Sequence, residues 1–277
     1  MKLTHILASA GILLSVFADA SANDANNILQ QVRDRNDGKD YMSTVTLKTL
    51  SDDSLLNQRQ FYMLQKDIDQ DEVMVLAIKA PADVRDISFL MRSFDEGTAQ
   101  EDEQWMYLPA FRKVRRISAT DKRGAFMGSE YSYYDLDKLR VTDFDSKIVK
   151  SESVNGVETH VIERTPKSQD VINKSGYYKL VTWVDKDRKL ILKQQYFDAK
   201  GILFKQLDVG KVDKIQGFWT ITASTMTNFI ENKKSTFLFH ETLYNQGIED
   251  AIFRKSKLKR GIKDSDVAEL TKISELE

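Results

Sequence analysis

The stretch WTITASTMTNFI, residues 219–230, alternates between apolar and polar side chains. Because successive side chains of a β-strand point to opposite faces, this pattern predicts a strand with two different faces. The predicted apolar face consists of Trp219, Ile221, Ala223 and Phe229. Such a strand packs its apolar face on a core and leaves its polar face in water.

The same alternation continues along the chain in both directions. Turn-forming residues separate the runs, as at Asn155-Gly156 and in residues 185–189 and 198–201. Because most connections are too short for a crossover helix, the runs predict a mainly β, antiparallel sheet. The other predicted strands are residues 41–48, 59–65, 73–79, 87–93, 104–108, 147–153, 157–165, 177–185, 190–197, 203–209 and 236–244.

A sheet of about a dozen strands with one apolar face must curl to bury that face. About eight strands enclose an interior that side chains can fill, and more strands leave additional room. The pattern therefore predicts a large curved sheet whose apolar interior accepts a hydrophobic ligand.

The first residues are typical of a secretory signal. Lys2 is followed by an apolar run over residues 6–17 and by small residues at 20–22. An uncleaved anchor is the alternative, but the apolar run is shorter than the roughly 20 residues that a membrane-spanning helix needs. We expect a signal peptide at residues 1–22, a single domain at 23–263 and a C-terminal tail at 264–277.

A short helix is expected to open the mature chain, with Asp24 as its cap and Ile28, Leu29 and Val32 on one face. The chain contains no cysteine, which excludes disulfides, thiol catalysis and a lipid-modified cysteine anchor. The sequence thus predicts a soluble protein exported to the periplasm.

The composition argues against nucleic-acid binding and offers little for catalysis. The net charge is −1, so no overall field attracts nucleic acid. His160 and His240 remain after signal cleavage, each inside a predicted strand, where a structural role is the more common one. Residues 67–72 begin like a calcium loop but have Glu72 where that loop needs glycine, which favours a hairpin turn. We expect no enzyme activity, no metal and no cofactor.

An outer-membrane barrel is a further alternative, because it also contains many alternating strands. Its lipid-facing side must be apolar throughout the membrane. Lys205 and Asp208 lie on opposite faces of one predicted strand, and Lys193 lies within another. These charges argue against the membrane barrel.

Residues 118–139, hereafter the flap, do not alternate. This segment contains two glycines, an apolar pair and three tyrosines, and we expect it to be partly helical. Phe126 and Met127 are predicted to close the ligand cavity, because methionine suits a changeable apolar contact. The alternative is that both side chains are ordinary core residues beneath a loop.

Other candidate ligand contacts are aromatic residues on the predicted strands. Such side chains line a cavity or simply pack the sheet, and both possibilities remain open. The candidates are Trp105, Tyr107, Trp183 and Trp219.

A basic cluster near residue 112 has two interpretations. It is either the solvated end of a hairpin or a docking patch for anionic lipid headgroups or an acidic partner. The candidate docking residues are Arg112, Arg115 and Arg116.

Three motifs resemble the LolA-like family of outer-membrane lipoprotein-sorting proteins. They are WMYLPAFRKVRRI at 105–117, GAFMGSEY at 124–131 and Asp135-Leu136. The chain departs from the family pattern at Asp86, where glycine is expected, and at Glu130, where aspartate is expected. The missing glycine raises the question of the backbone geometry just before Ile87.

The resemblance implies a half-open β-barrel with helices covering its concave side. It further implies a monomeric periplasmic carrier that holds acyl chains and passes lipid or acylated protein from the inner to the outer membrane. The expected partners are an inner-membrane RND-type transporter and an outer-membrane acceptor. The alternatives are a lipid or lipoprotein sensor, a structural accessory subunit of a membrane complex, and a lipid-modifying enzyme.

Overall fold

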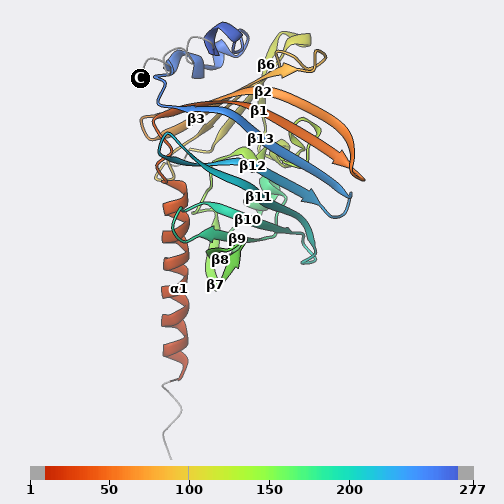
Figure 1. The fold of residues 1–277 in the computed structure, drawn as a ribbon. Coiled ribbons are helices and arrows are strands. Elements are labelled where there is room, and N and C mark those ends of the chain that lie inside the picture. Colours follow the sequence, from red (N-terminus) through yellow and green to blue (C-terminus); the bar gives the residue numbers. More distant parts are fainter. Residues whose placement is uncertain (1–9, 99, 268–277) are drawn as a thin grey trace, which may run out of the picture.

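The computed structural model describes residues 10–98 and 100–267, and these form one large antiparallel sheet (Figure 1). Its thirteen strands have the order β6-β5-β4-β3-β2-β1-β13-β12-β11-β10-β9-β8-β7. The outermost strands β6 and β7 do not pair with each other, so the barrel stays open. The mainly β, half-open architecture expected from the sequence is confirmed.

All twelve predicted strands are present, and their bounds are as follows. The first part of the sheet contains β1 (Asp40–Ser51), β2 (Ser54–Ile68), β3 (Asp71–Ala80), β4 (Ser88–Ser93), β5 (Glu103–Leu108) and β6 (Lys113–Ile117). The second part contains β7 (Phe144–Val154), β8 (Val157–Pro166), β9 (Lys179–Asp185), β10 (Ile191–Phe197), β11 (Leu203–Ile215), β12 (Phe218–Asn228) and β13 (Lys233–Tyr244).

The additional strand is β6, whose basic residues were expected to form either the solvated end of a hairpin or a docking patch. It pairs with β5, and Arg115 and Arg116 lie opposite Met106 and Trp105. Charged side chains on an edge strand hinder further strand pairing. They also hide the alternation by which a strand is recognised.

The predicted hairpin turns are confirmed. Asn155 and Gly156 both have positive φ, at 51° and 81°, as a tight turn between β7 and β8 requires. Residues 69 and 70 form the β2–β3 turn, as the hairpin interpretation of the calcium-like motif predicted.

Helix α1 (Ala10–Arg33) and short helix α2 (Gln169–Ser175) accompany the sheet. The helix predicted to start at Asp24 starts earlier, so Asp24 lies within α1 and does not cap it. Ala25 and Leu29 are fully buried against Ile162 and Val184, on the concave face of β8 and β9. Within the part of the chain that the structure describes, no helix meets the length and apolarity that a membrane crossing requires.

The two faces of the sheet are covered by different segments. Neighbouring residues Met63 and Leu64 belong to different core clusters, one on each face. The flap and α1 cover the concave face, and residues 246–267 cover the convex face of β1–β5. The Asp40 carboxylate accepts hydrogen bonds from the backbone of residues 246 and 248 and so fixes the start of this C-terminal segment.

The predicted tail begins inside this covering segment. The Tyr62 hydroxyl donates to Asp264 at 3.0 Å, and Val267 is buried on the convex face. Residues 268–277 of the predicted tail and residues 1–9 of the predicted signal lie outside the described residues. The division into signal, domain and tail remains a prediction.

The inward face of β12 agrees only in part with the one predicted. Ile221 lines the inner side as expected, whereas Trp219 and Phe229 are exposed and Thr220, Met226 and Asn228 are buried instead. Polar side chains are tolerated inside because each finds a hydrogen-bond partner, as when the Asn228 amide donates to Glu130 of the flap at 2.7 Å. The alternation of apolar and polar residues therefore assigned the core side of this strand only in part.

Asp86 has φ of 65°, in the left-handed region that glycine adopts freely. Its backbone N–H donates to the Ile78 carbonyl at 3.0 Å, which holds the β3–β4 connection in place. Non-glycine residues are strained in this region, although aspartate tolerates it better than most. The positive φ explains why glycine suits this position.

We expect Asp86→Val to lower the free energy of unfolding by about 1–2 kcal/mol, since a β-branched residue is strained at positive φ. Asp86→Gly, the matched control, should not lower it, because glycine adopts this conformation freely. Urea unfolding of the two variants measures both values. Equal stability of the valine and glycine variants would contradict the strain argument.

Candidate functional site

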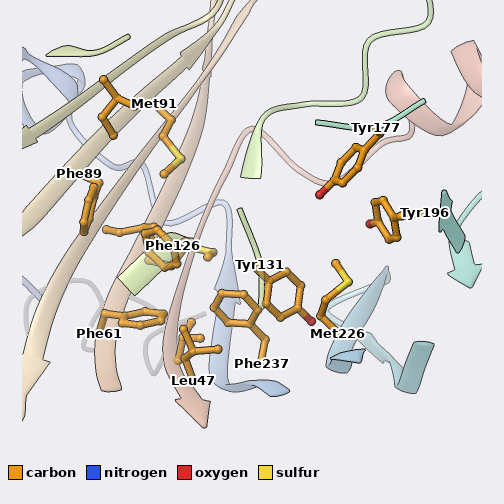
Figure 2. Packing of buried hydrophobic residues seen from close by; sticks show 14 of the residues in the cluster. Leu47, Phe61, Phe89, Met91, Phe126, Tyr131, Tyr177, Tyr196, Met226 and Phe237 are labelled. Atoms are coloured by element: carbon orange, nitrogen blue, oxygen red, sulfur yellow. The ribbon is translucent and has the colours of Figure 1, made fainter. Parts of the chain in front are cut away.

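The flap folds into the concave face of the sheet and fills part of it. It contains three 3-10 turns, η2 (Thr120–Arg123), η3 (Phe126–Gly128) and η4 (Tyr134–Leu136), which confirms the expected partly helical character. Phe126 is fully buried, with its ring centroid 6.4 Å from that of Phe61 and 5.2 Å from that of Phe89 (Figure 2). Met127 packs against the same cluster.

Two buried ion pairs hold the flap in this position. Lys122 Nζ lies 2.8 Å from Asp137 Oδ2 within the flap, and both side chains are buried. Lys205 Nζ of β11 lies 3.2 Å from Asp135 Oδ2, and it also donates to the Tyr177 hydroxyl at 3.1 Å. The Tyr177 hydroxyl donates to Asp135 Oδ1 at 2.7 Å, so the carboxylate is bonded on both oxygens.

The same network affects the ionisation of its tyrosine. Burial, followed by the negative charge of Asp135, raises the pKa of Tyr177 well above its ordinary value. Tyr177 therefore stays protonated and remains a hydrogen-bond donor. Because Tyr177, Asp135 and Lys205 are buried and hydrogen-bonded to one another, they hold the flap in a single position against the sheet.

Two adjacent cavities remain between the flap, α1 and the sheet. The inner cavity has a volume of about 400 Å³, and the side cavity, towards β9 and β10, about 250 Å³. They share the lining residues Asp135, Lys138, Leu139, Leu207 and Ile221, so they lie next to each other. Other apolar lining of the inner cavity comes from Tyr41, Met63, Tyr131, Val209, Phe237 and Phe239.

One end of the inner cavity is charged. Lys138 Nζ and Glu72 Oε2 lie 2.8 Å apart, and Arg35 and Asp37 stand nearby in the lining. Burial raises the pKa of both Glu72 and Asp37, and neighbouring cations oppose this effect. The cavity is therefore amphipathic, with an apolar interior and a polar end.

A third space, the outer cavity, lies on the other side of the flap residues Tyr131 and Ser132. Its volume is about 260 Å³, and its lining includes Glu130, Phe204 and Gly176. It shares Tyr131 with the inner cavity and Tyr177 with the side cavity. The Tyr131 hydroxyl bonds with the Ser224 hydroxyl at 3.0 Å, so the flap and its tyrosine contacts separate the outer cavity from the inner two.

The cleft of largest volume, about 580 Å³, has a different character. Charged side chains dominate its wall, and several of them pair with one another, as Arg140 Nη1 does with Asp102 Oδ1 at 3.0 Å. Such a wall is unsuited to a hydrocarbon chain, because charged groups are costly to cover with apolar surface. The inner and side cavities are the better candidates for a hydrophobic ligand.

None of the predicted ligand contacts lines the inner, side or outer cavity. Phe126 and Met127 lie in the packed concave core, so their role in closing the cavity stays a prediction. Trp105 and Tyr107 instead pack on the convex face beneath the C-terminal segment, where Lys255 Nζ lies 3.9 Å from the Trp105 ring centroid.

Two further candidates also lie away from the cavities. Trp183 follows the inward-facing Thr182 and points to the opposite face, where it donates to Glu152 at 3.0 Å. Trp219 is 37% exposed, next to Arg188 and Lys214. None of the four strand aromatics lines the inner or the side cavity.

The aromatic residues that do line the cavities were not selected from the sequence. They include Tyr41, Tyr131, Tyr177, Tyr196 and Phe237, several of which Figure 2 shows around the flap. One signal pointed towards this wall, since Leu207 and Val209 share the apolar side of their strand. The candidates were chosen because their side chains are large and aromatic, without regard to the face of the strand on which they lie. For this reason the aromatic residues that line the cavities were missed.

The predicted docking arginines lie on the β5–β6 hairpin. Arg112 is in the turn with φ of 50°, and it is exposed. Arg115 Nη2 lies 3.3 Å from Asp121, and Arg116 Nη2 lies 3.1 Å from Glu103. These three side chains are close in sequence and lie outside the cavities that face the sheet.

Comparisons with known proteins agree with this geometry. A family model described as "Uncharacterized protein" matches residues 70–260. No curated protein matches the chain at a significant level. A DUF1329 family protein from Desulfovibrio piger is 30% identical, with a TM-score of 0.79; the match covers 86% of this chain and 99% of that protein.

Two other solved structures are similar. The "putative outer membrane lipoprotein-sorting protein domain" of Vibrio parahaemolyticus is 29% identical with a TM-score of 0.78, over 86% of this chain and 100% of that one. A LolA superfamily protein from Nitrosomonas europaea is 19% identical with a TM-score of 0.64, over 84% and 98% of the two chains. At 19% identity, the similarity to the Nitrosomonas europaea protein shows a shared fold and nothing further.

Proposed function

Since this chain belongs to the DUF1329 family and has a LolA-like fold, we propose that it is a periplasmic carrier of acyl chains. Its cargo is a lipid or an acylated protein that passes between the inner and the outer membrane. The proposed donor is an inner-membrane transporter of the RND type, and the proposed receiver is an acceptor at the outer membrane. We propose no catalytic step for this chain.

The observation that carries this proposal is the unfilled apolar space on the concave face. The inner cavity, at about 400 Å³, lies within the range of roughly 300–1,000 Å³ typical of small-molecule sites. Side chains of the sheet and flap leave this space open although the surrounding core is closely packed. A purely structural protein gains nothing from such an open space, because close packing of side chains stabilises a protein interior.

The energetics of transport support a cavity of this kind. Each buried methylene contributes about 0.8 kcal/mol, so a long acyl chain gains on the order of 10 kcal/mol from leaving water. Its polar end then lies near Arg35, Lys138 and Glu72 at the charged end of the inner cavity. An amphiphile with one apolar tail fits the inner cavity, because its tail matches the apolar interior and its head matches the charged end.

Release of cargo requires the flap to move. Gly128 has φ of 73°, and glycine is the residue that changes its backbone conformation most freely, so we place the hinge of the flap there. The contacts that resist movement include the Lys205–Asp135 pair, the Tyr131–Ser224 bond and the Asn228–Glu130 bond. Opening these contacts would join the outer cavity to the inner one.

The test is native mass spectrometry of the protein isolated from the periplasm. We expect one acyl-bearing molecule bound to each chain, and the same site to be refilled when delipidated protein is titrated with a fluorescent fatty acid. Protein that neither contains lipid nor binds the probe would contradict the carrier proposal and favour the structural accessory subunit.

A further inference from the structure

Large apolar side chains that face water are concentrated at one end of the sheet. The described part of the chain contains nine exposed large hydrophobic residues, and seven of them lie at this end. Their exposed fractions range from 42% to 70%. These seven residues, hereafter the rim, are Leu55, Leu56, Phe111, Tyr178, Ile202, Phe229 and Ile230.

Strand order and register place most of the rim in one row. The β1–β2 and β12–β13 turns touch, because the Asp52 N–H donates to the Asn232 carbonyl at 3.3 Å. The Phe229 N–H donates to the Phe204 carbonyl at 2.9 Å, which connects β12–β13 to the β10–β11 turn. The Tyr178 N–H donates to the Phe197 carbonyl at 3.0 Å and extends the row to β9.

The β5–β6 turn lies at the same end of the sheet. Tyr107 pairs with Ser88, and Ser88 pairs with Ala77, so β5 ends at the end of the sheet where β3 ends, and β2 extends beyond that point to Ser54. Phe111, the most exposed aromatic residue of the rim, therefore lies at the same end of the sheet as Leu55 and Ile230.

Phe111 is followed by two exposed basic residues, Arg112 and Lys113. Among the described residues, neither side chain has an ion-pair partner. A protruding phenylalanine with adjacent unpaired cations matches the boundary of an anionic bilayer, where the ring enters the acyl region and the cations remain with the headgroups. The cations argue against an apolar protein surface, and the protruding ring beside them favours a bilayer over an acidic protein surface.

We propose that the rim docks this protein on anionic lipid bilayers. Most of its apolar residues lie at or next to the turns of separate hairpins, and Tyr178 lies in the connection between α2 and β9. Short protruding turns of this kind insert separately among lipid headgroups. A flat protein interface would instead need a continuous apolar patch, and charged residues such as Lys234 and Asp53 interrupt the row here. Basic residues near the membrane then strengthen attachment in a salt-dependent way.

Docking in this orientation presents the outer cavity to the membrane. Phe204, which lines that cavity, bonds through its backbone to the rim residue Phe229. An acyl chain that leaves the bilayer would therefore meet the outer cavity before the flap. This role of the rim rests on the proposed carrier function, because a protein without lipid cargo has no use for the route.

Vesicle co-sedimentation tests the docking. We expect binding to vesicles of phosphatidylglycerol and phosphatidylcholine, weak binding to phosphatidylcholine alone, and loss of binding at high salt. Phe111→Ser with Ile230→Ser should reduce binding about tenfold, because two inserted side chains are removed. Arg112→Ser with Lys113→Ser should abolish the preference for anionic vesicles.

The matched controls are Val149→Ser and Trp219→Ser, since these exposed apolar residues lie outside the rim. Both controls should bind vesicles like the unaltered protein. If the rim variants also bind unchanged, or if the controls weaken binding equally, the docking proposal is wrong.

A separate measurement tests acyl-chain binding independently of vesicle docking. The fluorescent fatty acid is added to the same variants in solution, without vesicles. Rim variants should bind the probe normally, because the rim lies outside the inner and side cavities. Vesicle binding without probe binding would reject the carrier and retain the docking surface, and the reverse result would reject the docking surface alone.

Discussion

Lys205→Ala is expected to lower the free energy of unfolding by about 3–5 kcal/mol, the range found when one partner of a buried ion pair is removed. The substitution leaves Asp135 buried beneath the flap without its cation. Asp135 would keep the hydrogen bonds from Ser132 and Tyr177, but these do not neutralise its charge. The flap should therefore loosen before the sheet unfolds.

Chemical unfolding and hydrogen exchange of the flap measure this effect. The control is Lys211→Ala on the same strand, whose side chain is 66% exposed and pairs with Asp213. That change should shift stability by less than about 0.5 kcal/mol, since exposed pairs contribute little. Equal effects of the two substitutions would refute the buried network as the anchor of the flap.

A second variant separates charge from packing. Lys205→Met with Asp135→Asn removes both charges; the amide oxygen accepts from Ser132, and the amide N–H donates to the Tyr177 hydroxyl. This double variant should recover most of the lost stability, because no unpaired charge remains buried. A double variant as unstable as Lys205→Ala would show that shape, and not charge, holds the flap.

Leu207→Trp is expected to weaken binding of an acyl probe at least about tenfold, which corresponds to about 1.4 kcal/mol. Leu207 lines both the inner and the side cavity and so lies between them. An indole ring there would occupy space that the ligand tail needs. The space is unfilled in the present structure, so the larger side chain should be accommodated with little strain.

Titration of delipidated protein with the fluorescent fatty acid gives the affinity, and thermal unfolding verifies that the fold is intact. Val149→Trp, on the exposed edge strand β7, introduces the same side chain far from the cavities and serves as the control. It should bind the probe like the original protein. Unaltered binding by Leu207→Trp would mean that the acyl chain does not lie in this space.

Much of the sheet follows from short-range patterns in the chain. Every predicted alternating run is a strand, and the turns at Asn155-Gly156 and at residues 198–201 connect neighbouring strands. The strand β6 escaped prediction because Lys113, Arg115 and Arg116 mask its alternation. Charged side chains at a sheet edge prevent pairing with further strands, and a local sequence pattern does not show which strand lies at an edge.

The candidate site was predicted less completely. The glycines and aromatics of the flap marked it as unusual, and Phe126 and Met127 do lie in the concave core. The strand aromatics were selected because their side chains are large and apolar, yet Trp105 and Trp183 lie on the convex face. Residue type does not reveal which face of a two-sided sheet turns inward, since here both faces are covered in places.

The sequence by itself determined the antiparallel strands, their hairpins and the position of the flap, because these depend on residues near one another in the chain. Only the tertiary structure decided which strand faces line the cavities and how the flap is held. Lys205 and Asp135 are 70 residues apart, and register shifts in β11 change which β12 side chains lie opposite it. Such choices arise from long-range packing, where a buried polar group is accepted once a distant partner satisfies it.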